Sequence, residues 1–287
     1  MSAFLITGAR GFIGRSLGQR LESEGHSIIG LSTANGDISD KATLRPYRGS
    51  EIQHVFHLAA RSFVPQSWSE PLEFHRVNTT GTLNVLEFCR ERQLSLTYVS
   101  AYLYGQPLEQ PIREHHPVIP NNPYGLSKML AEAACEFYAR THGLKVTVVR
   151  PFNVYGFGQR ENFLIPTILR QVLFAREIEV QDLAPRRDYL YIDDLIELLL
   201  ATLNAPPGYN VYNGGTGSSL SVAEVIALAQ AEAGTSKPVR CGQVVRTHEI
   251  SDTRADVEKA RCELGWSPRY NFRDGIRMTV AMMREAE

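Results

Sequence analysis

The sequence predicts an α/β protein with a doubly wound parallel sheet and a smaller C-terminal lobe. Strand-like and helix-like stretches alternate through the first two hundred residues, which is typical of βαβ units around a parallel sheet. A glycine-rich turn joins the first predicted strand to the first predicted helix. After residue 151 the alternation loosens, and loops rich in proline, glycine and asparagine become frequent. We therefore expect the sheet to come first and the lobe to follow.

The expected elements follow in chain order. Strands are predicted at 3–7, 27–31, 54–59, 96–100 and 146–151. Helices are predicted at 14–23, 79–93, 124–141, 193–204 and 220–233. Gly143 lies just beyond the third of these helices, where a C-cap glycine belongs. Loops are expected around 156–162, 184–187 and 204–218.

Composition argues against several classes of protein. The 287 residues, 43% of them hydrophobic, suit one large domain or two interlocked ones. The formal net charge is -1 with no basic block, so we expect no nucleic-acid partner. The four cysteines form no C-x-x-C pair and no cluster with histidine, so neither a metal site nor a disulfide framework is indicated. No charged or long apolar segment precedes the first strand, and we expect a cytoplasmic protein that does not enter the membrane.

The glycine-rich turn is the first candidate site. It places Gly8, Gly11 and Gly14 between a strand and a helix, as a phosphate-binding turn requires. Gly8 permits the tight turn, Gly11 lets the backbone approach a pyrophosphate, and Gly14 lets helix and strand pack closely. The phosphates would lie at a helix N-terminus, where N–H groups are unpaired and the dipole favours negative charge. The turn indicates a Rossmann-type dinucleotide-binding domain, with G-x-x-G-x-x-G in place of G-x-G-x-x-G.

Two positions near this turn favour a phosphorylated cofactor. The second strand of such folds usually ends in an acid that binds the adenine ribose and excludes a 2′-phosphate. Here it runs into Ser32 and Thr33, with no acid. Arg10, inside the turn, carries a guanidinium that suits bidentate pairing with a phosphate. We therefore expect NAD(P), with NADP(H) favoured over NAD(H), and Arg10 and Ser32 beside the adenine ribose.

A Tyr-x-x-x-Lys pair opens the long predicted helix. Tyr124 and Lys128 lie four residues apart and so share one side of it. The ordinary pKa of a phenol is about 10, and a nearby ammonium together with an oxidised nicotinamide lowers that pKa. The tyrosine then becomes usable as a general acid or base. Ser100, at the end of a predicted strand, offers a hydroxyl that can hydrogen-bond a substrate oxygen.

Taken together, several segments resemble the extended short-chain dehydrogenase/reductase family. They are TGARGFIG at 7–14, GDI at 36–38, HLAA at 57–60, the residues Ser100, Tyr124 and Lys128, and RPFN at 150–153. More narrowly, the set resembles the NAD-dependent epimerase/dehydratase branch, which acts on sugar nucleotides, and the match covers essentially the whole chain. We expect a dinucleotide-binding Rossmann domain at 1–160, to which 188–213 returns. Residues 161–187 and 214–287 are expected to form a substrate-binding lobe.

The resemblance implies which residues bind the cofactor. Asp37 and Ile38 would contact adenine, residues 58–60 would line the pyrophosphate and ribose, and Pro151 would pass beside the nicotinamide. The implied set is Gly8, Arg10, Gly11, Phe12, Ile13, Gly14, Ser32, Asp37, Ile38, Leu58, Ala59, Ala60, Asn78, Tyr124, Lys128 and Pro151.

The resemblance also implies the reacting groups. Tyr124 would be the acid or base, and Ser100 would orient the reacting oxygen of the substrate. Lys128 would hold the nicotinamide ribose and lower the pKa of Tyr124, while Asn78 would support the active site. No metal ligand is implied.

The implied substrate is a nucleoside-diphosphate sugar. Besides Ser100, five residues match the places where the family holds it: Asn153, Asn162, Phe163, Arg187 and Arg246. The two arginines are fixed cations on separate segments, which suits them to clamp a pyrophosphate.

Three reactions share this scaffold. The 4,6-dehydratases place an acidic pair directly after the active-site serine or threonine, and here those positions are Ala101 and Tyr102, so elimination has no evident catalyst. The NADPH preference favours a reductase, and residues 61–68 and 163–166 resemble 4-keto-6-deoxy-sugar nucleotide reductases. Residues 153–156 resemble those of 4-epimerases.

We therefore favour reduction at C4, with epimerisation as the alternative and a non-catalytic dinucleotide sensor as a remote one. A sensor would typically lose the tyrosine or the lysine, and this chain keeps both. By analogy with the family, the predicted helices 79–93 and 124–141 would pair with a second copy in a homodimer.

Overall fold

The protein is described from a computed structural model that covers residues 3–242 and 250–286. Its main element is a six-stranded sheet in the order β10-β5-β4-β3-β1-β2, in which all neighbours are parallel. The strands are β1 (Ala3–Thr7), β2 (Ser27–Leu31), β3 (His54–His57), β4 (Ser95–Val99), β5 (Val146–Pro151) and β10 (Tyr209–Gly214). The predicted doubly wound Rossmann-type fold is confirmed.

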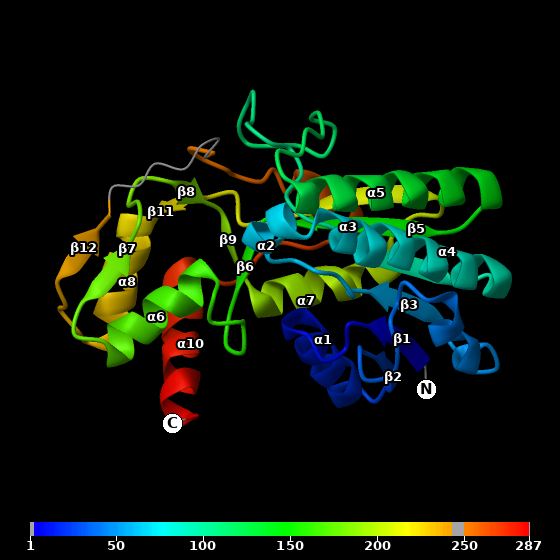
Figure 1. The fold of residues 1–287 in the computed structure, drawn as a ribbon, viewed down its shortest axis with the longest axis horizontal. Helices are drawn as coiled ribbons and strands as arrows, with labels where there is room; N and C mark the ends of the chain where they lie inside the picture. The colour runs from blue at the N-terminus through cyan, green and yellow to red at the C-terminus, as the bar shows by residue number, and fades with distance from the viewer. Residues whose placement is uncertain (1–2, 243–249, 287) are drawn as a thin grey trace.

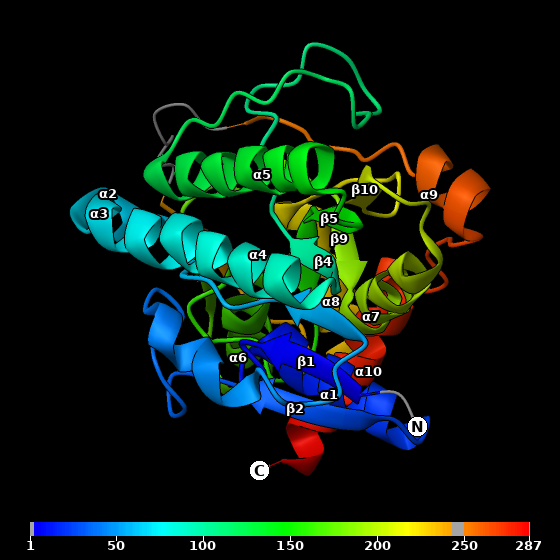
Figure 2. The same ribbon diagram turned by 90° about the vertical axis from the view of Figure 1, so that its right-hand side faces the viewer.

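Helices cover both faces of this sheet (Figure 1). On one face α4 (Gly81–Arg92) and α5 (Pro123–His142) lie side by side, as Figure 2 shows. On the other face α1 (Phe12–Ser23) packs against α7 (Ile192–Ala201). A parallel sheet covered on both sides is buried throughout, which explains why its strands are apolar runs rather than alternating ones.

Each strand supplies side chains to two separate cores, because successive residues point to opposite faces. In β1, Leu5 packs in the core that includes Val85 of α4. Its neighbour Ile6 packs in the other core, which includes Leu17 of α1 and Leu195 of α7. The sheet is thereby packed against helices on both faces, which keeps its carboxyl edge rigid.

Two strands end one or two residues earlier than predicted, and both ends lie at this carboxyl edge. β3 ends at His57 instead of residue 59, and β4 ends at Val99 instead of residue 100. Residues 58–60 and Ser100 therefore lie just outside the strands. In open α/β sheets ligands bind in the crevice outside the carboxyl ends of the strands.

A run of short helices leads into α4, where the sequence indicates only the helix 79–93. The run consists of α2 (Val64–Ser69), α3 (Pro71–Phe74) and a π-helical stretch (His75–Thr80). Pro65 and Pro71 lie in the first turns of α2 and α3, where proline is tolerated. Prolines and a π-helical stretch break the usual helical period, which explains why the sequence pattern does not reveal this run.

The prediction of a loop over 204–218 is wrong, because these residues contain β10. The strand reads YNVYNG, and its asparagines and glycine are poor strand formers. It forms because it pairs with β5 over its whole length and buries Tyr212 completely. The loop predicted at 184–187 likewise contains a two-residue strand, β8 (Arg186–Arg187). The helix predicted at 220–233 begins at residue 222, two residues later than predicted.

The remaining elements form a small lobe beside the carboxyl edge of the sheet (Figure 1). Its helices are α6 (Leu164–Phe174), α8 (Val222–Ala233) and α10 (Phe272–Glu285). Its strand pairs are β8 with β11 (Leu220–Ser221) and β7 (Ile178–Val180) with β12 (Val239–Cys241). A third pair, β6 (Asn153–Tyr155) with β9 (Tyr189–Tyr191), joins the lobe to the sheet, and α9 (Glu258–Leu264) packs on β10.

Three further observations concern the part of the chain that the structure describes. All four cysteines are free thiols. Over residues 3–242 and 250–286, no helix combines the length and the apolar character needed to cross a membrane. In the same ranges, no three His, Cys, Asp or Glu side chains gather as a metal-binding group would.

Candidate active site

The glycine turn is shaped by contacts that any side chain would break. Gly8 has a φ of +74°, and a Cβ on it would lie 2.8 Å from the backbone nitrogen of Ala59. A Cβ on Gly14 would lie 2.2 Å from the carbonyl oxygen of Gly8. Gly11 is the N-cap of α1, and neither a side-chain cap nor an acid occupies the first turn. The first N–H groups of α1 thus have no capping side chain, and this cradle fits the pyrophosphate of a dinucleotide.

Arg15 connects the glycine turn to the loop that follows β6, a contact that sequence reasoning missed. Its guanidinium donates to the carbonyl of Arg10 and to that of Gly158, both at 3.1 Å. Phe12 and Ile13 are half-buried and pack against the core, so their backbone faces the cradle while their side chains do not. No local pattern reveals the contact of Arg15 with Gly158, because the two residues are far apart in the chain.

The residues predicted to meet a 2′-phosphate lie together at the end of β2. The backbone nitrogen of Ala9 donates to the carbonyl of Leu31 at 3.0 Å, which holds the glycine turn against the strand. Arg10 is exposed, and among the described residues it forms no ion pair with an acid. The Ser32 hydroxyl bonds to Asn35 Oδ1 at 3.1 Å. The end of β2 thus carries one cation, Arg10, and neutral polar side chains.

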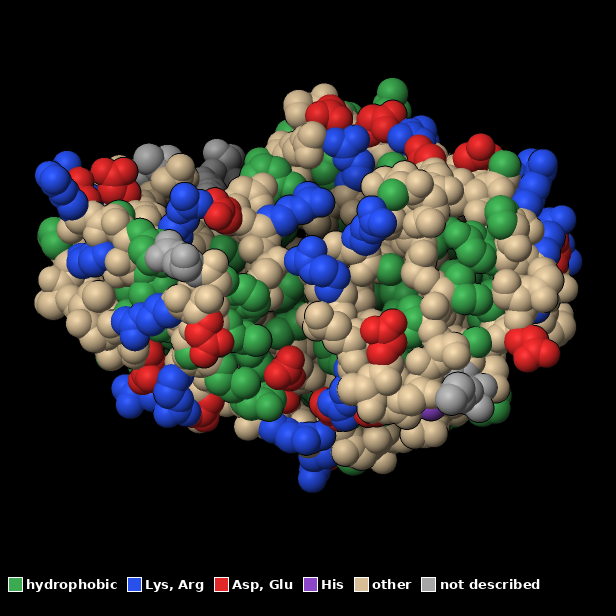
Figure 3. All heavy atoms as spheres, turned by 90° about the horizontal axis from the view of Figure 1, so that it is seen from below, with side chains coloured by type: hydrophobic (Ala, Val, Ile, Leu, Met, Phe, Trp, Pro, Cys, Tyr) green, Lys and Arg blue, Asp and Glu red, His purple; other side chains and the backbone are tan. Residues whose placement is uncertain are grey.

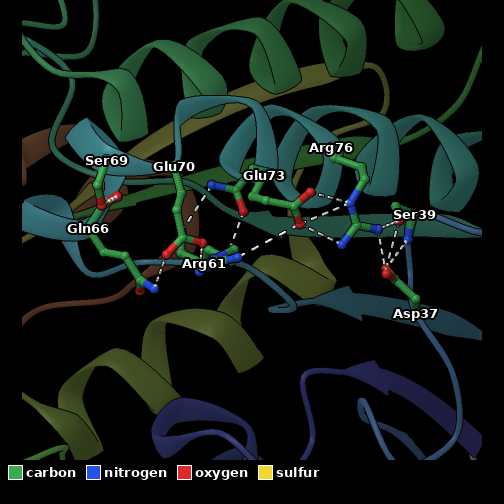
Figure 4. Close-up of polar contacts among 9 residues, drawn as sticks. Asp37, Ser39, Arg61, Gln66, Ser69, Glu70, Glu73 and Arg76 are labelled. Atoms are coloured by element: carbon green, nitrogen blue, oxygen red, sulfur yellow. Dashed lines mark hydrogen bonds and ion pairs between the residues drawn. The ribbon is translucent and has the colours of Figure 1, made fainter.

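Asp37 lies at one end of a row of alternating charges, which Figure 4 shows. Its carboxylate accepts from Arg76 and from Ser39, and Arg76 pairs with Glu73 at 2.8 Å. Burial raises the pKa of Asp37, but the hydrogen bonds from Arg76 and Ser39 outweigh it and hold the pKa below its usual value. The row continues from Glu73 to Arg61. Oδ2 of Asp37 keeps room for a further donor, as the predicted contact with an adenine amino group requires.

The other predicted cofactor residues of the sheet line the same edge. Ile38 is buried beneath Gly81, the first residue of α4. Leu58, Ala59 and Ala60 follow β3 and are half-buried beside the glycine turn. Pro151 ends β5 and is buried. Leu58, Ala59, Ala60 and Pro151 therefore lie at the carboxyl edge of the sheet, at the ends of β3 and β5.

Asn78 connects three segments from a fully buried position. Its Oδ1 accepts from the backbone nitrogen of Arg61 at 2.8 Å, and its Nδ2 donates to the carbonyl of Arg61 at 3.0 Å. Nδ2 also donates to Ser127 Oγ at 2.9 Å, and Ser127 lies between Tyr124 and Lys128 on α5. Asn78 thus fixes the predicted catalytic helix to the segment after β3. Sequence reasoning did not identify Ser127, although its i+3 spacing from Tyr124 is a usable signal.

Lys128 is held at the last residue of β4, and Ser100 is the next residue along the chain. Lys128 Nζ donates to the carbonyl of Val99 at 2.6 Å and lies 4.2 Å from the centre of the Tyr98 ring. Burial lowers the pKa of Lys128 to about 7, although the negative charge of Glu132 acts to raise it. Ser100 Oγ is buried, and it has no hydrogen-bond partner within the described residues. Other buried oxygens also lack a partner, Tyr98 Oη and Thr147 Oγ1 among them, but Ser100 is the one predicted to meet the reacting oxygen, which would satisfy it.

Tyr124 lies at the start of α5, with its ring edge against Phe74. Asn122 is the N-cap of this helix and accepts from Gly125 N at 2.8 Å, which fixes where the helix begins. Burial raises the pKa of the Tyr124 phenol, and Lys128 is not among the causes of its shift. In the protein without cofactor, burial therefore favours the neutral phenol.

The predicted substrate residues lie where the sheet meets the small lobe, and one lies outside the described residues. Asn153 Nδ2 donates to the carbonyl of Asp188 at 3.3 Å. Phe163 is the N-cap of α6 and packs edge-on against Phe63 across the two parts of the molecule. Asn162 is exposed in the turn before it, and Arg187 donates to the carbonyl of Ile250 at 2.6 Å. Arg246 belongs to 243–249, which the structure does not describe.

Asp188 organises the loops beside these residues, and sequence reasoning gave it no role. Its buried carboxylate accepts from the backbone nitrogens of Thr216, Gly217 and Ala255, at 2.7 to 3.0 Å. Burial raises its pKa and outweighs these hydrogen bonds. Asp188 therefore fixes three segments of the small lobe next to Arg187. Its position directly after an arginine pair is the only signal in the sequence.

The face seen in Figure 3 is hollowed near its middle, and Lys and Arg side chains gather around the hollow. The whole chain has a formal net charge of -1, so this gathering is a local feature. Cationic walls around a cleft attract anionic ligands and raise their local concentration. A dinucleotide and a nucleoside-diphosphate sugar are both anions of this kind.

Comparison with known proteins covers nearly the entire chain. The family model described as NAD dependent epimerase/dehydratase family matches residues 4–215. The GDP-6-deoxy-D-mannose reductase of Pseudomonas aeruginosa is 30% identical over an alignment of 294 positions, which covers 96% of this chain and 95% of that protein. The UDP-glucose 4-epimerase of Lactobacillus helveticus is 29% identical over 314 residues, with the same two shares.

Solved structures agree with this likeness in both parts of the molecule. The UDP-glucose 4-epimerase of Thermotoga maritima, solved with UDP-glucose, gives a TM-score of 0.92 at 27% identity and covers 99% of both chains. RMD from Pseudomonas aeruginosa, complexed with NADPH, gives a TM-score of 0.92 at 28% identity and covers 100% of both chains. The similarity therefore extends over the sheet and the small lobe together.

Proposed function

Because the chain belongs to the NAD-dependent epimerase/dehydratase family of extended short-chain dehydrogenase/reductases, we propose that it reduces the C4 ketone of a 4-keto-6-deoxy nucleoside-diphosphate sugar with NADPH. The observation that carries the proposal is the buried Ser100 Oγ, which has no partner within the described residues and directly follows Val99, whose carbonyl accepts from Lys128 Nζ. Leaving such a hydroxyl unpaired is costly, and a substrate oxygen placed there removes the cost.

The chain's own residues supply the proton and the orientation. The bound reduced nicotinamide supplies the hydride that C4 accepts. Ser100 Oγ donates a hydrogen bond to the C4 oxygen, and Tyr124 donates its phenolic proton to that oxygen as negative charge develops on it. The raised pKa of Tyr124 keeps the phenol protonated, as a reduction requires. Lys128, fixed by the Val99 carbonyl, keeps two further N–H groups for the ribose hydroxyls.

A dehydratase remains disfavoured by the two positions after Ser100. Ala101 is buried and has no titratable group. Tyr102 Oη donates to the carbonyl of Gly105 at 2.6 Å, and burial raises the pKa of its phenol. Neither residue can remove a C5 proton as a carboxylate would, so elimination lacks its base.

The preference for NADPH is supported by Arg10 and Ser32. The exposed guanidinium of Arg10 and the neutral surroundings of Ser32 suit a 2′-phosphate, and an acid that would repel it is absent from residues 31–35. Among similar proteins, RMD from Pseudomonas aeruginosa was solved with NADPH. A reductase consumes its cofactor stoichiometrically, which fits a site for the phosphorylated form.

A 4-epimerase is the second candidate, favoured by the epimerase-like residues 153–156 and by relatives that are UDP-glucose 4-epimerases. Such an enzyme would retain NAD and oxidise and reduce the same sugar. The test is to incubate the full chain with 4-keto and 4-hydroxy sugar nucleotides and each reduced cofactor. Stoichiometric loss of NADPH absorbance with a 4-keto substrate supports the reductase. Interconversion without net loss, and NAD released on denaturation, supports the epimerase and overturns the reductase.

The substrate itself is proposed to bind between the sheet and the small lobe. Asn153, Asn162 and Phe163 would surround the sugar and its phosphates, with Arg187 and Arg246 clamping the diphosphate. This placement fits the division that we propose. The dinucleotide-binding domain comprises residues 1–160 and 188–213, and the substrate-binding lobe comprises residues 161–187 and 214–287. Similar proteins were solved with UDP-glucose and with UDP-glucuronic acid.

A homodimer is proposed through α4 and α5. These neighbouring helices expose Leu83, Leu126, Leu130 and Phe137, which are apolar side chains that a partner would cover. Light scattering of the purified protein tests the proposal, and a mass of one chain at micromolar concentration would contradict it.

A further inference from the structure

A buried histidine connects the cofactor-lining backbone to the active site. His57 is the last residue of β3 and is 1% exposed. Its Nδ1 lies 2.6 Å from Thr7 Oγ1, at the end of β1, and its Nε2 lies 3.0 Å from Thr82 Oγ1, at the start of α4. Both threonines are fully buried. Two strands of the sheet, β1 and β3, and the helix α4 therefore meet at one imidazole.

The other partners of the two hydroxyls determine which ring nitrogen carries the proton. Thr82 Oγ1 donates to the carbonyl of Asn78 at 2.6 Å, so it must accept from a protonated Nε2. Thr7 Oγ1 accepts from the backbone nitrogen of Ala59 at 3.2 Å and shares that of Leu58, at 3.2 Å, with the Thr7 carbonyl, at 3.1 Å, so its own proton goes to Nδ1. Only the neutral Nε2–H imidazole satisfies every partner. Burial and the charge of Lys128 lower the pKa of His57 to about 3, in agreement with this form.

The two arms of this network end at different parts of the predicted site. One arm runs through Thr7 to the backbone of Leu58 and Ala59, which faces the glycine turn. A Cβ on Gly8 would lie 2.8 Å from Ala59 N, so the two walls are already in tight contact. The other arm runs through Thr82 to Asn78, which holds the catalytic helix α5.

We propose that His57 is a positioning residue for the dinucleotide. Through Thr7 it sets the distance between the glycine turn and residues 58–59, the two backbone walls between which the pyrophosphate and ribose would lie. This inference rests on the proposed function, because it needs a dinucleotide at the glycine turn. A small displacement of either wall would misplace several backbone contacts at once, and binding energy falls steeply when such contacts are misaligned.

β3 carries a matched histidine at its opposite end, which serves as a control. His54 is 4% exposed, with Nε2 at 2.9 Å from Thr97 Oγ1 and Nδ1 at 2.6 Å from Ser95 Oγ. Thr97 in turn bonds to Thr202, whose hydroxyl donates to Leu199 O, so His54 is also the neutral Nε2–H form. Burial lowers its pKa to about 3 as well. The two sites differ in place, since His54 lies at the amino end of the strand.

The test compares isosteric variants of the two threonines in the full chain. Thr7→Val and Thr97→Val each remove one hydroxyl that bonds to a histidine, so both should lower the melting temperature by a similar amount. Only Thr7→Val should weaken NADPH binding, by about tenfold, measured by fluorescence titration; this corresponds to roughly 1.4 kcal/mol. Thr7→Ser keeps the hydroxyl and should restore the affinity.

Equal losses of NADPH affinity in Thr7→Val and Thr97→Val, or no loss in Thr7→Val, would overturn the positioning role. A wild-type chain that binds neither NADPH nor NADH would instead remove the proposed function, so the two failures are distinguishable.

If Thr7→Val does not fold, His57→Asn and His57→Gln replace it. Asn places an acceptor near the position of Nδ1 and keeps the Thr7 arm, whereas Gln places a donor near Nε2 and keeps the Thr82 arm. The affinity for NADPH should then be higher in His57→Asn, and the reverse order would contradict the proposal.

Discussion

The sheet and the small lobe hold their candidate functional residues in different ways. In the sheet domain, Ser100 directly follows β4, Lys128 lies on the long helix α5 and Asn78 lies in the π-helical stretch before α4, and all three side chains are buried. In the small lobe, Asn162 is exposed in a turn and Arg187 lies on a two-residue strand, held by backbone carbonyls. Residues on rigid elements keep a geometry to within fractions of an ångström, whereas residues on loops adapt more easily to different ligands. This difference fits our proposal that the sheet domain carries the chemistry and the small lobe binds the substrate.

The largest expected effect separates chemistry from binding. Tyr124→Phe removes the phenolic proton donor but keeps the ring that packs on Phe74. We expect kcat to fall roughly 10²–10⁴-fold, the usual contribution of general acid–base catalysis, while the dissociation constant for NADPH stays within about threefold. Initial rates and cofactor titration measure the two quantities. Turnover close to that of the wild type would refute the catalytic role of Tyr124 and would leave the chemistry of the sheet unassigned.

A second variant tests the small lobe in the opposite sense. Arg187→Met should raise KM for the sugar nucleotide about 10–100-fold with little change in kcat, because a hydrogen bond to a charged group contributes roughly 1.5–3 kcal/mol. The matched control is Arg186→Met, since Arg186 pairs with Glu224 and Ser219 instead. If kcat falls and KM does not change, the division of labour between sheet and lobe is wrong.

The stability of the sheet should also depend on pH, because two buried histidines lie in β3. The pKa values of His54 and His57 are both lowered to about 3, below the value of about 6.5 in the unfolded chain. Between these values the unfolded chain binds more protons, so stability is lost as the pH falls from 6.5 toward 3. We expect the free energy of unfolding in urea to drop by about 2 kcal/mol from pH 6 to pH 5. His54→Phe should reduce this slope by about half, and an unchanged slope would show that the histidines are not buried in neutral form.

The smallest effect concerns cofactor choice. Arg10→Ala should weaken NADPH about tenfold and NADH less than twofold, because a single exposed guanidinium contributes modestly to phosphate binding. Parallel titrations with the two cofactors measure the ratio, and NADH serves as the internal control. Equal losses would show that Arg10 does not meet a 2′-phosphate and would weaken the case for a reductase.

The sequence predicts the sheet better than the lobe, and the reason is physical. β5 is a run of β-branched residues buried on both faces, so its period and composition agree with its place in the fold. β10 contains asparagines and a glycine, which are poor strand formers, and it forms because it pairs with β5. A local sequence pattern does not predict pairing of this kind. The small lobe is built from strands of two or three residues, too short to show a period.

The same distinction applies to the site. Ser100, Tyr124 and Lys128 could be proposed from the sequence, because their spacing and their strand or helix positions match the chemistry that we propose for them. The network of His57 was not, because Thr7 and Thr82 are distant in the chain and their contacts arise only when β1, β3 and α4 pack together. Arg15 and Asp188 belong to this second kind, since their partners also come from remote segments.

The late position of β10 in the chain has a consequence for biosynthesis. A ribosome completes β5 well before it reaches β10, and the stretch between them takes on the order of 3–10 s to translate at 5–20 residues per second. During that interval the outer edge of β5 has no neighbour, and its unpaired N–H and C=O groups form a template for pairing with another nascent chain. Expression at reduced temperature or with holding chaperones should therefore improve the yield of folded protein, by protecting that edge until β10 arrives.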